Sequence, residues 1–102
     1  DGLAMSSRNQ YLSPDERALS ATIHRTLLAM RAAILAGTPR HVVEGQADAT
    51  LRDAGFVPDY AVVRRPDLTE PTDGEAGGLV ALIAARLGRT RLIDNLAFAA
   101  AG

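Results

Sequence analysis

The chain has 102 residues, a net charge of −1, a hydrophobic fraction of 47% and a charged fraction of 23%, which allow one small folded domain and argue against intrinsic disorder. The chain lacks the basic field that holds a nucleic-acid backbone, and its longest apolar run, from Leu79 to Ala85, is far shorter than the ~20 residues of a membrane helix. Neither a nucleic-acid nor a membrane partner is therefore expected, and the absence of cysteine excludes disulfides and thiolate metal sites.

A long helix is predicted to begin near residue 14. Ser13 can cap it, Pro14 suits the first helical position, and Glu16 completes a capping box. Gly37 is typical of the residue that follows a helix C-terminus, so we expect the helix over Pro14–Ala36. Apolar residues recur along it at spacings of three and four, and this face is expected to be core: Leu19, Ile23, Leu27, Met30 and Ile34.

A second helix is predicted between Thr38-Pro39, which repeats the same start signal, and Gly55. Its apolar stripe is weaker and consists of Val43, Ala47, Thr50, Leu51 and Ala54. Gly45 inside this segment costs about 1 kcal/mol relative to alanine. We therefore expect this helix to depend on packing against the rest of the domain.

The second half of the chain is predicted to form strands. Asp59–Arg64 is rich in β-branched and aromatic residues, whereas Pro66–Gly78 has the composition of a loop. Leu79–Leu87 suits a helix by propensity and a buried strand by its flanking glycines. The glycine turn at Gly88-Arg89, before a further short run at 90–95, favours a hairpin. The predicted fold class is α+β, with two helices packed on a small, three-stranded, mainly antiparallel sheet in two layers.

The first twelve residues show no helical periodicity and are expected to form a loop. Within it, the Ser6 and Ser7 hydroxyls can donate hydrogen bonds, and Arg8 can bind a phosphate in bidentate fashion. All 11 basic residues of the chain are arginine, so no lysine ammonium is available for an anion. On these residues alone, a solvated terminal tail remains the alternative to an anion-binding loop.

Two separated blocks of sequence resemble the C-terminal segment of the pantoate–β-alanine ligase family. The first is Asp-Gly-Leu-Ala-Met-Ser-Ser-Arg-Asn at 1–9, followed by Tyr11-Leu12-Ser13, and the second runs from Ala84 to Asn95. Their order and separation fit the family, so the resemblance spans essentially the whole chain. The region between them fits as a pattern of two helices followed by a strand. The chain is accordingly expected to be a piece of a longer protein.

The resemblance implies part of an enzyme that activates pantoate with ATP, forming pantoyl adenylate and pyrophosphate, and then joins it to β-alanine with release of AMP. It implies a nucleotide-contacting loop at 1–12 and a globular part at 13–102, with Mg²⁺ brought by ATP and held outside this chain. Contacts to ATP are implied for Met5, Ser6, Ser7 and Arg8. The resemblance assigns no catalytic residue and no metal ligand here.

For the complete protein, the resemblance implies an N-terminal nucleotide-binding domain, a homodimer and a cytoplasmic location. The 102-residue piece is expected to be inactive alone. The alternative function, from a different class, is a non-catalytic protein-interaction or anion-binding module.

Several other polar residues are expected to have ordinary structural roles. His24 and His41 are interpreted as ordinary surface or boundary histidines. Arg64-Arg65 could hold a polyphosphate, although a solvated strand end is the favoured interpretation. Asp94-Asn95 is expected to follow the last strand and to serve as a turn or cap, with a catalytic role as the alternative. The glycine-rich segment 74–78 lacks the preceding strand and following lysine of a phosphate loop.

Overall fold

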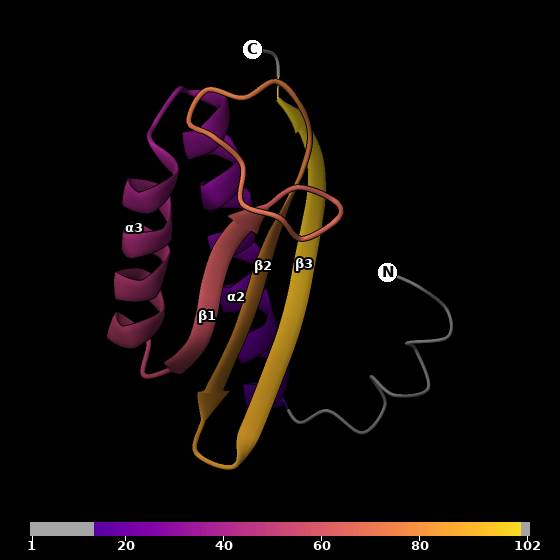
Figure 1. Cartoon of the computed structure of the whole chain (residues 1–102). Helices are drawn as coiled ribbons and strands as arrows, with labels where there is room; N and C mark the ends of the chain where they lie inside the picture. Colours follow the sequence, from indigo (N-terminus) through magenta and orange to yellow (C-terminus); the bar gives the residue numbers. More distant parts are fainter. Residues whose placement is uncertain (1–13, 101–102) are drawn as a thin grey trace.

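The computed structural model of the chain describes residues 14–100. Helices α2 and α3 pack on one face of a three-stranded sheet of order β1-β2-β3, with both strand pairs antiparallel (Figure 1). The elements are α2 (Pro14–Leu35), α3 (Arg40–Asp53), β1 (Val57–Arg64), β2 (Gly77–Leu87) and β3 (Thr90–Ala100). The predicted two-layer α+β fold is therefore confirmed.

Helix α2 buries the apolar face that its sequence spacing predicted. Ile23, Leu27 and Met30 are fully buried against the sheet and α3, and Leu19 and Ile34 are partly buried around them. The helix stops at Leu35, one residue before the predicted end. Gly37 follows in a left-handed conformation, with φ of 93°, which glycine adopts without the steric cost that a side chain would bring.

Helix α3 receives its N-terminal cap from a distant loop. Its N-cap residue, Pro39, has no side-chain acceptor, so the backbone N–H of Arg40 donates to the Asp73 carboxylate at 2.8 Å. A carboxylate at this position is also stabilised by the positive end of the helix dipole. The face that points into the core consists of Val43, Ala47 and Leu51.

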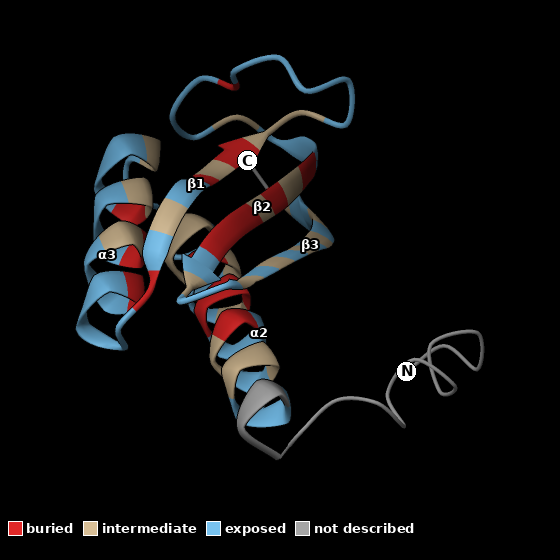
Figure 2. Cartoon of the chain, turned by 90° about the horizontal axis from the view of Figure 1, so that it is seen from below, coloured by how far each residue is buried: buried red, intermediate tan, exposed pale blue. Residues whose placement is uncertain are grey.

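Strand β2 lies at the centre of the sheet and supplies most of the sheet's core residues. Its burial alternates over residues 78–83, which is a strand pattern and removes the helical alternative for this segment. Gly88 makes the predicted turn into β3 with a φ of 61°. The residues that face the helices from β1 and β2 are Ala61, Val63, Leu79, Ala81, Ile83 and Ala85. Figure 2 shows the buried residues gathered between the helices and the sheet.

Strand β3 is longer than the sequence predicted. It continues to Ala100 and pairs with β2 along its whole length, so Asp94 and Asn95 lie inside the strand. The prediction that these two residues follow the last strand as a turn or cap is therefore wrong. Their side chains point to opposite sheet faces, because successive strand residues alternate. Asp94 faces the helices, where its Oδ2 lies 4.0 Å from the Nδ1 of His24.

Candidate functional site

The residues predicted to contact a nucleotide, Met5, Ser6, Ser7 and Arg8, lie outside the described residues, as does the whole predicted loop at 1–12. The described part of the chain places other polar groups together at two positions. One is the loop between β1 and β2 with the adjoining start of α3, and the other is the exposed face of the sheet.

The loop between β1 and β2 is organised around the Glu75 carboxylate. Arg65 donates to both of its oxygens, from Nε at 2.8 Å and from Nη2 at 2.7 Å, in a bidentate pair. The backbone N–H of Thr72 donates to Oε1 at 3.1 Å. The Arg65 guanidinium, and next the Thr72 N–H, lower the pKa of Glu75 to about 2. The glycine-rich segment 74–78 therefore contains a carboxylate, Glu75, that is held by hydrogen bonds from the preceding loop.

Three hydrogen-bond donors converge on the Glu44 carboxylate of α3. Its Oε2 accepts hydrogen bonds from Arg40 at 3.0 Å, from Arg64 at 3.1 Å and from the backbone N–H of Val63 at 3.0 Å. Val63 lies on β1, the edge strand beside α3, so the carboxylate accepts from an edge N–H with which another strand could otherwise pair.

Arg64 and Arg65 therefore do not form the solvated strand end that we favoured from the sequence. Each guanidinium is partly buried in an ion pair, Arg64 with Glu44 and Arg65 with Glu75. The partners lie 20 and 10 residues away in the sequence, so no local pattern indicated them. Because both cations are already paired, a polyphosphate would have to compete with two carboxylates.

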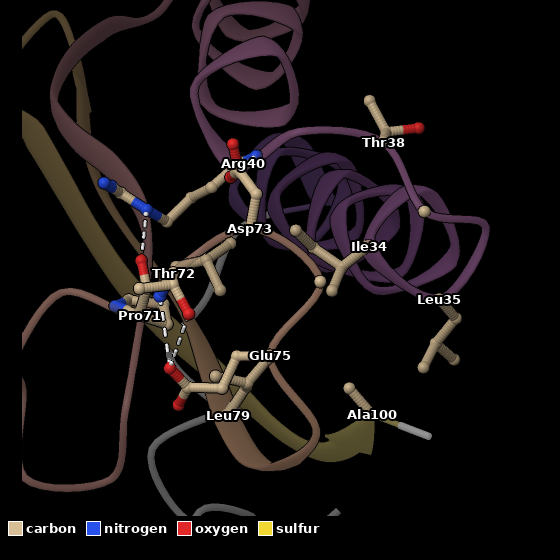
Figure 3. Close-up of a pocket in the computed structure, with 13 residues that line it drawn as sticks. Ile34, Leu35, Thr38, Arg40, Pro71, Thr72, Asp73, Glu75, Leu79 and Ala100 are labelled. Atoms are coloured by element: carbon tan, nitrogen blue, oxygen red, sulfur yellow. Dashed lines mark hydrogen bonds between the residues drawn. The ribbon is translucent and has the colours of Figure 1, made fainter. Parts of the chain in front are cut away.

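A cavity of about 140 Å³ lies between the end of α2, the start of α3 and residues 71–75. Figure 3 shows Arg40 along one side, where its Nε donates to the Pro71 carbonyl at 3.2 Å, and Ile34, Leu35 and Ala100 along the other. The volume is well below the roughly 300–1,000 Å³ of ordinary small-molecule sites. The charged groups that line it, Arg40, Asp73 and Glu75, already bond to other residues of the chain. The cavity is therefore explained as a gap in the packing under the loop.

The exposed face of the sheet holds one carboxylate between two guanidiniums. Asp59 on β1 accepts from Arg86 on β2 at 3.0 Å and from Arg91 on β3 at 2.9 Å. Hydrogen bonds from Arg91 and then Arg86 lower the pKa of Asp59. An irregularity in the β1–β2 register falls at Asp59, between Pro58 and Tyr60. This cluster joins all three strands, and no local pattern indicated it, because the two arginines are 27 and 32 residues away from Asp59.

The two histidines are exposed, as expected from the sequence. Among residues 14–100, no group of three or more His, Asp or Glu side chains is arranged to hold a metal ion. In the same range, neither helix combines the length and apolar character that crossing a membrane requires.

Comparison with known proteins gives a consistent family assignment. A family profile described as pantoate-beta-alanine ligase matches residues 1–97. Pantothenate synthetase of Xanthomonas oryzae pv. oryzae (strain PXO99A) is 66% identical over 98 residues, which cover 96% of this chain and 35% of that relative. The pantothenate synthetase of Stenotrophomonas maltophilia (strain K279a) is 64% identical over 99 residues. The chain thus spans about a third of the length of the curated relatives it matches.

A solved structure agrees with the sequence comparison. The crystal structure of pantothenate synthetase from Thermus thermophilus has a TM-score of 0.72 and 36% identity to this chain, covering 88% of this chain and 33% of that one. The profile match runs through the predicted loop and the whole described fold up to residue 97. The chain therefore belongs to the pantoate–β-alanine ligase family.

Proposed function

We propose that this chain is the C-terminal, lid-forming part of an ATP-dependent ligase that condenses pantoate with β-alanine. The observation that carries the proposal is the family match over residues 1–97, which includes the segment with Met5, Ser6, Ser7 and Arg8. The relatives are about three times as long as the matched region, which leaves room for a further domain. We propose that this N-terminal domain holds the nucleotide and pantoate. The complete protein is proposed to be a cytoplasmic homodimer.

The proposed reaction has two steps. The pantoate carboxylate attacks the α-phosphorus of ATP, and the bond to the β-phosphate oxygen breaks, giving pantoyl adenylate and pyrophosphate. The amine of β-alanine then attacks the acyl carbon, AMP leaves with the bonding electron pair, and the amine loses a proton to give pantothenate. In the first step negative charge builds on the phosphate oxygens, where positioned donors stabilise the transition state.

The residues at the start of the chain are proposed to supply such donors. Ser6 and Ser7 donate from their hydroxyls, Arg8 pairs with phosphate oxygens, and Met5 contacts the nucleotide. Helix α2 begins six residues after Arg8, so a movement of the domain would carry this segment with it. Coupling of closure to phosphate binding would keep water from the reactive adenylate.

Magnesium enters the proposal as a partner of ATP. The described residues contain no cluster fitted to hold it, so no magnesium ligand is proposed in residues 14–100. The lone chain is proposed to be inactive, since the pantoate pocket and the nucleotide base site belong to the other domain.

The test is Arg8→Ala in the complete protein, with pyrophosphate release measured in the presence of ATP and pantoate. Loss of one such donor is expected to lower kcat about 10²–10³-fold. Arg52→Ala is the matched control, because Arg52 is an exposed arginine paired within α3, and it should leave kcat unchanged. An Arg8→Ala enzyme with wild-type kinetics would remove Arg8 from the site, and adenylate formation by the 102-residue chain alone would contradict the division of labour.

A further inference from the structure

We propose that the outer face of the sheet, the face turned away from α2 and α3, is the surface on which the rest of the complete ligase packs. This inference rests on the proposed function, since it requires the chain to be one domain of a longer enzyme. The outer face is defined by the apolar residues Val57, Tyr60, Val62, Val80, Leu82 and Ile93.

The strand register brings these side chains together in rows. Tyr60, Ala84 and Ile93 lie at paired positions across the three strands, and Val62 and Leu82 form the next row. Ala84, in the middle of the Tyr60 row, is fully buried. Residues at paired positions share a sheet face, so the Tyr60 row is apolar across β1, β2 and β3, while Asn95 takes the β3 position of the Val62–Leu82 row.

The outer face holds half of the large hydrophobic residues that are exposed in the described part of the chain. Of the six large hydrophobic residues exposed in the described part of the chain, Val57, Tyr60 and Ile93 belong to it. Both helices pack on the opposite face (Figure 1), and no described element pairs with the outer edge of β3. A contiguous apolar face beside an open strand edge is characteristic of a protein interface.

The length of the family's enzymes identifies the occupant. About two-thirds of each curated relative lies outside the region that this chain matches, and that part must contact the present domain if the two close around one substrate. The helix layer uses its apolar stripes internally, in contacts with the sheet. The outer face is an apolar surface that those contacts leave open.

Charge at one end of the outer face supports the same occupant. Arg86 and Arg91 share a single carboxylate, Asp59, so this corner carries one more cation than anion. The opposing surface is therefore expected to present a carboxylate to this corner, which would fix the register of the two parts.

The test compares cysteine accessibility at matched positions of the complete protein. Ile93 is 59% exposed in this domain and Leu68, in the β1–β2 loop, is 62% exposed, so both would react at similar rates if nothing covered either. Ile93→Cys and Leu68→Cys are labelled with a maleimide, and each peptide is quantified by mass spectrometry, normalised to its rate in urea. Because a face covered in nine molecules of ten reacts about tenfold more slowly, Ile93→Cys should lag by at least about tenfold.

A second variant and a dilution series complete the test. Val57→Cys, at 58% exposure, should be protected like Ile93→Cys. Equal labelling at positions 57, 68 and 93 would overturn the proposal. So would protection that disappears on dilution, because a second copy of the chain would then be the occupant. Labelling does not depend on activity, so the two proposals can fail separately. A protected face in a protein that releases no pyrophosphate would refute the proposed reaction and still support the interface.

Discussion

Replacement of Glu44 by alanine tests whether the contact between α3 and the edge of β1 stabilises the domain. Its Oε2 accepts three hydrogen bonds, from Arg40, Arg64 and the Val63 N–H, and its side chain is 19% exposed. The two partly exposed guanidiniums would each lose roughly 0.5–1 kcal/mol of pairing. The Val63 N–H would lose its acceptor, which costs about 1–3 kcal/mol of stability. Alanine returns a few tenths of a kcal/mol through its higher helix propensity.

The expected loss in free energy of unfolding is therefore about 2–4.5 kcal/mol, or a fall in Tm of roughly 10–35 °C for a domain of this size. Urea unfolding of the 102-residue chain followed by circular dichroism measures it. Asp48→Ala is the matched control, because Asp48 pairs with Arg52 one turn further along the same helix, with side chains 45% and 58% exposed. That exposed pair is expected to be worth about 0.5 kcal/mol or less. Equal losses for the two variants would refute the assignment of Glu44 as a link between layers.

Three further predictions concern the same domain. Gly45→Ala should stabilise it by about 0.5–1 kcal/mol in urea unfolding, because an added Cβ in α3 meets nothing within 4 Å; a loss of stability would contradict the open space there. Leu51→Ala should cost about 2–5 kcal/mol, since Leu51 is fully buried between α3 and the sheet, and faster proteolysis of the variant would report it. The pKa of Glu75 is lowered from 4.5 to about 2, so the stability from its pair with Arg65 is present above pH 4.5 and lost as pH falls toward 2. The stability difference between wild type and Glu75→Gln should therefore shrink over that range, and a difference that stays constant with pH would be the contrary result.

The elements with strong local signals could be predicted from the sequence. The capping box and Pro14 predicted the start of α2, and Gly37 predicted its end to within one residue. The apolar stripe predicted which face of the helix is buried. The glycine turn at Gly88 located the hairpin, although the apolar run before it also suited a helix. Pairing on both sides decides that segment, because β2 can satisfy its backbone groups between β1 and β3.

Features that depend on tertiary contacts could not be predicted in this way. The last part of β3 is alanine-rich, and alanine favours helices locally; its pairing with Gly77–Leu82 overrides that preference. The partners of Arg64 and Arg65 come from α3 and from the far side of the loop, and Asp59 meets its two arginines through strand register. The residues that the sequence singled out for nucleotide contact, Met5 to Arg8, lie outside the described residues and stay a prediction.

The most direct test of the proposed function is a crystal structure of the complete protein with ATP bound and its domains closed. We predict that the Ser6 and Ser7 hydroxyls and the Arg8 guanidinium lie within hydrogen-bond distance, about 2.5–3.2 Å, of phosphate oxygens. A closed structure in which these three side chains point into solvent, away from the nucleotide, would contradict it.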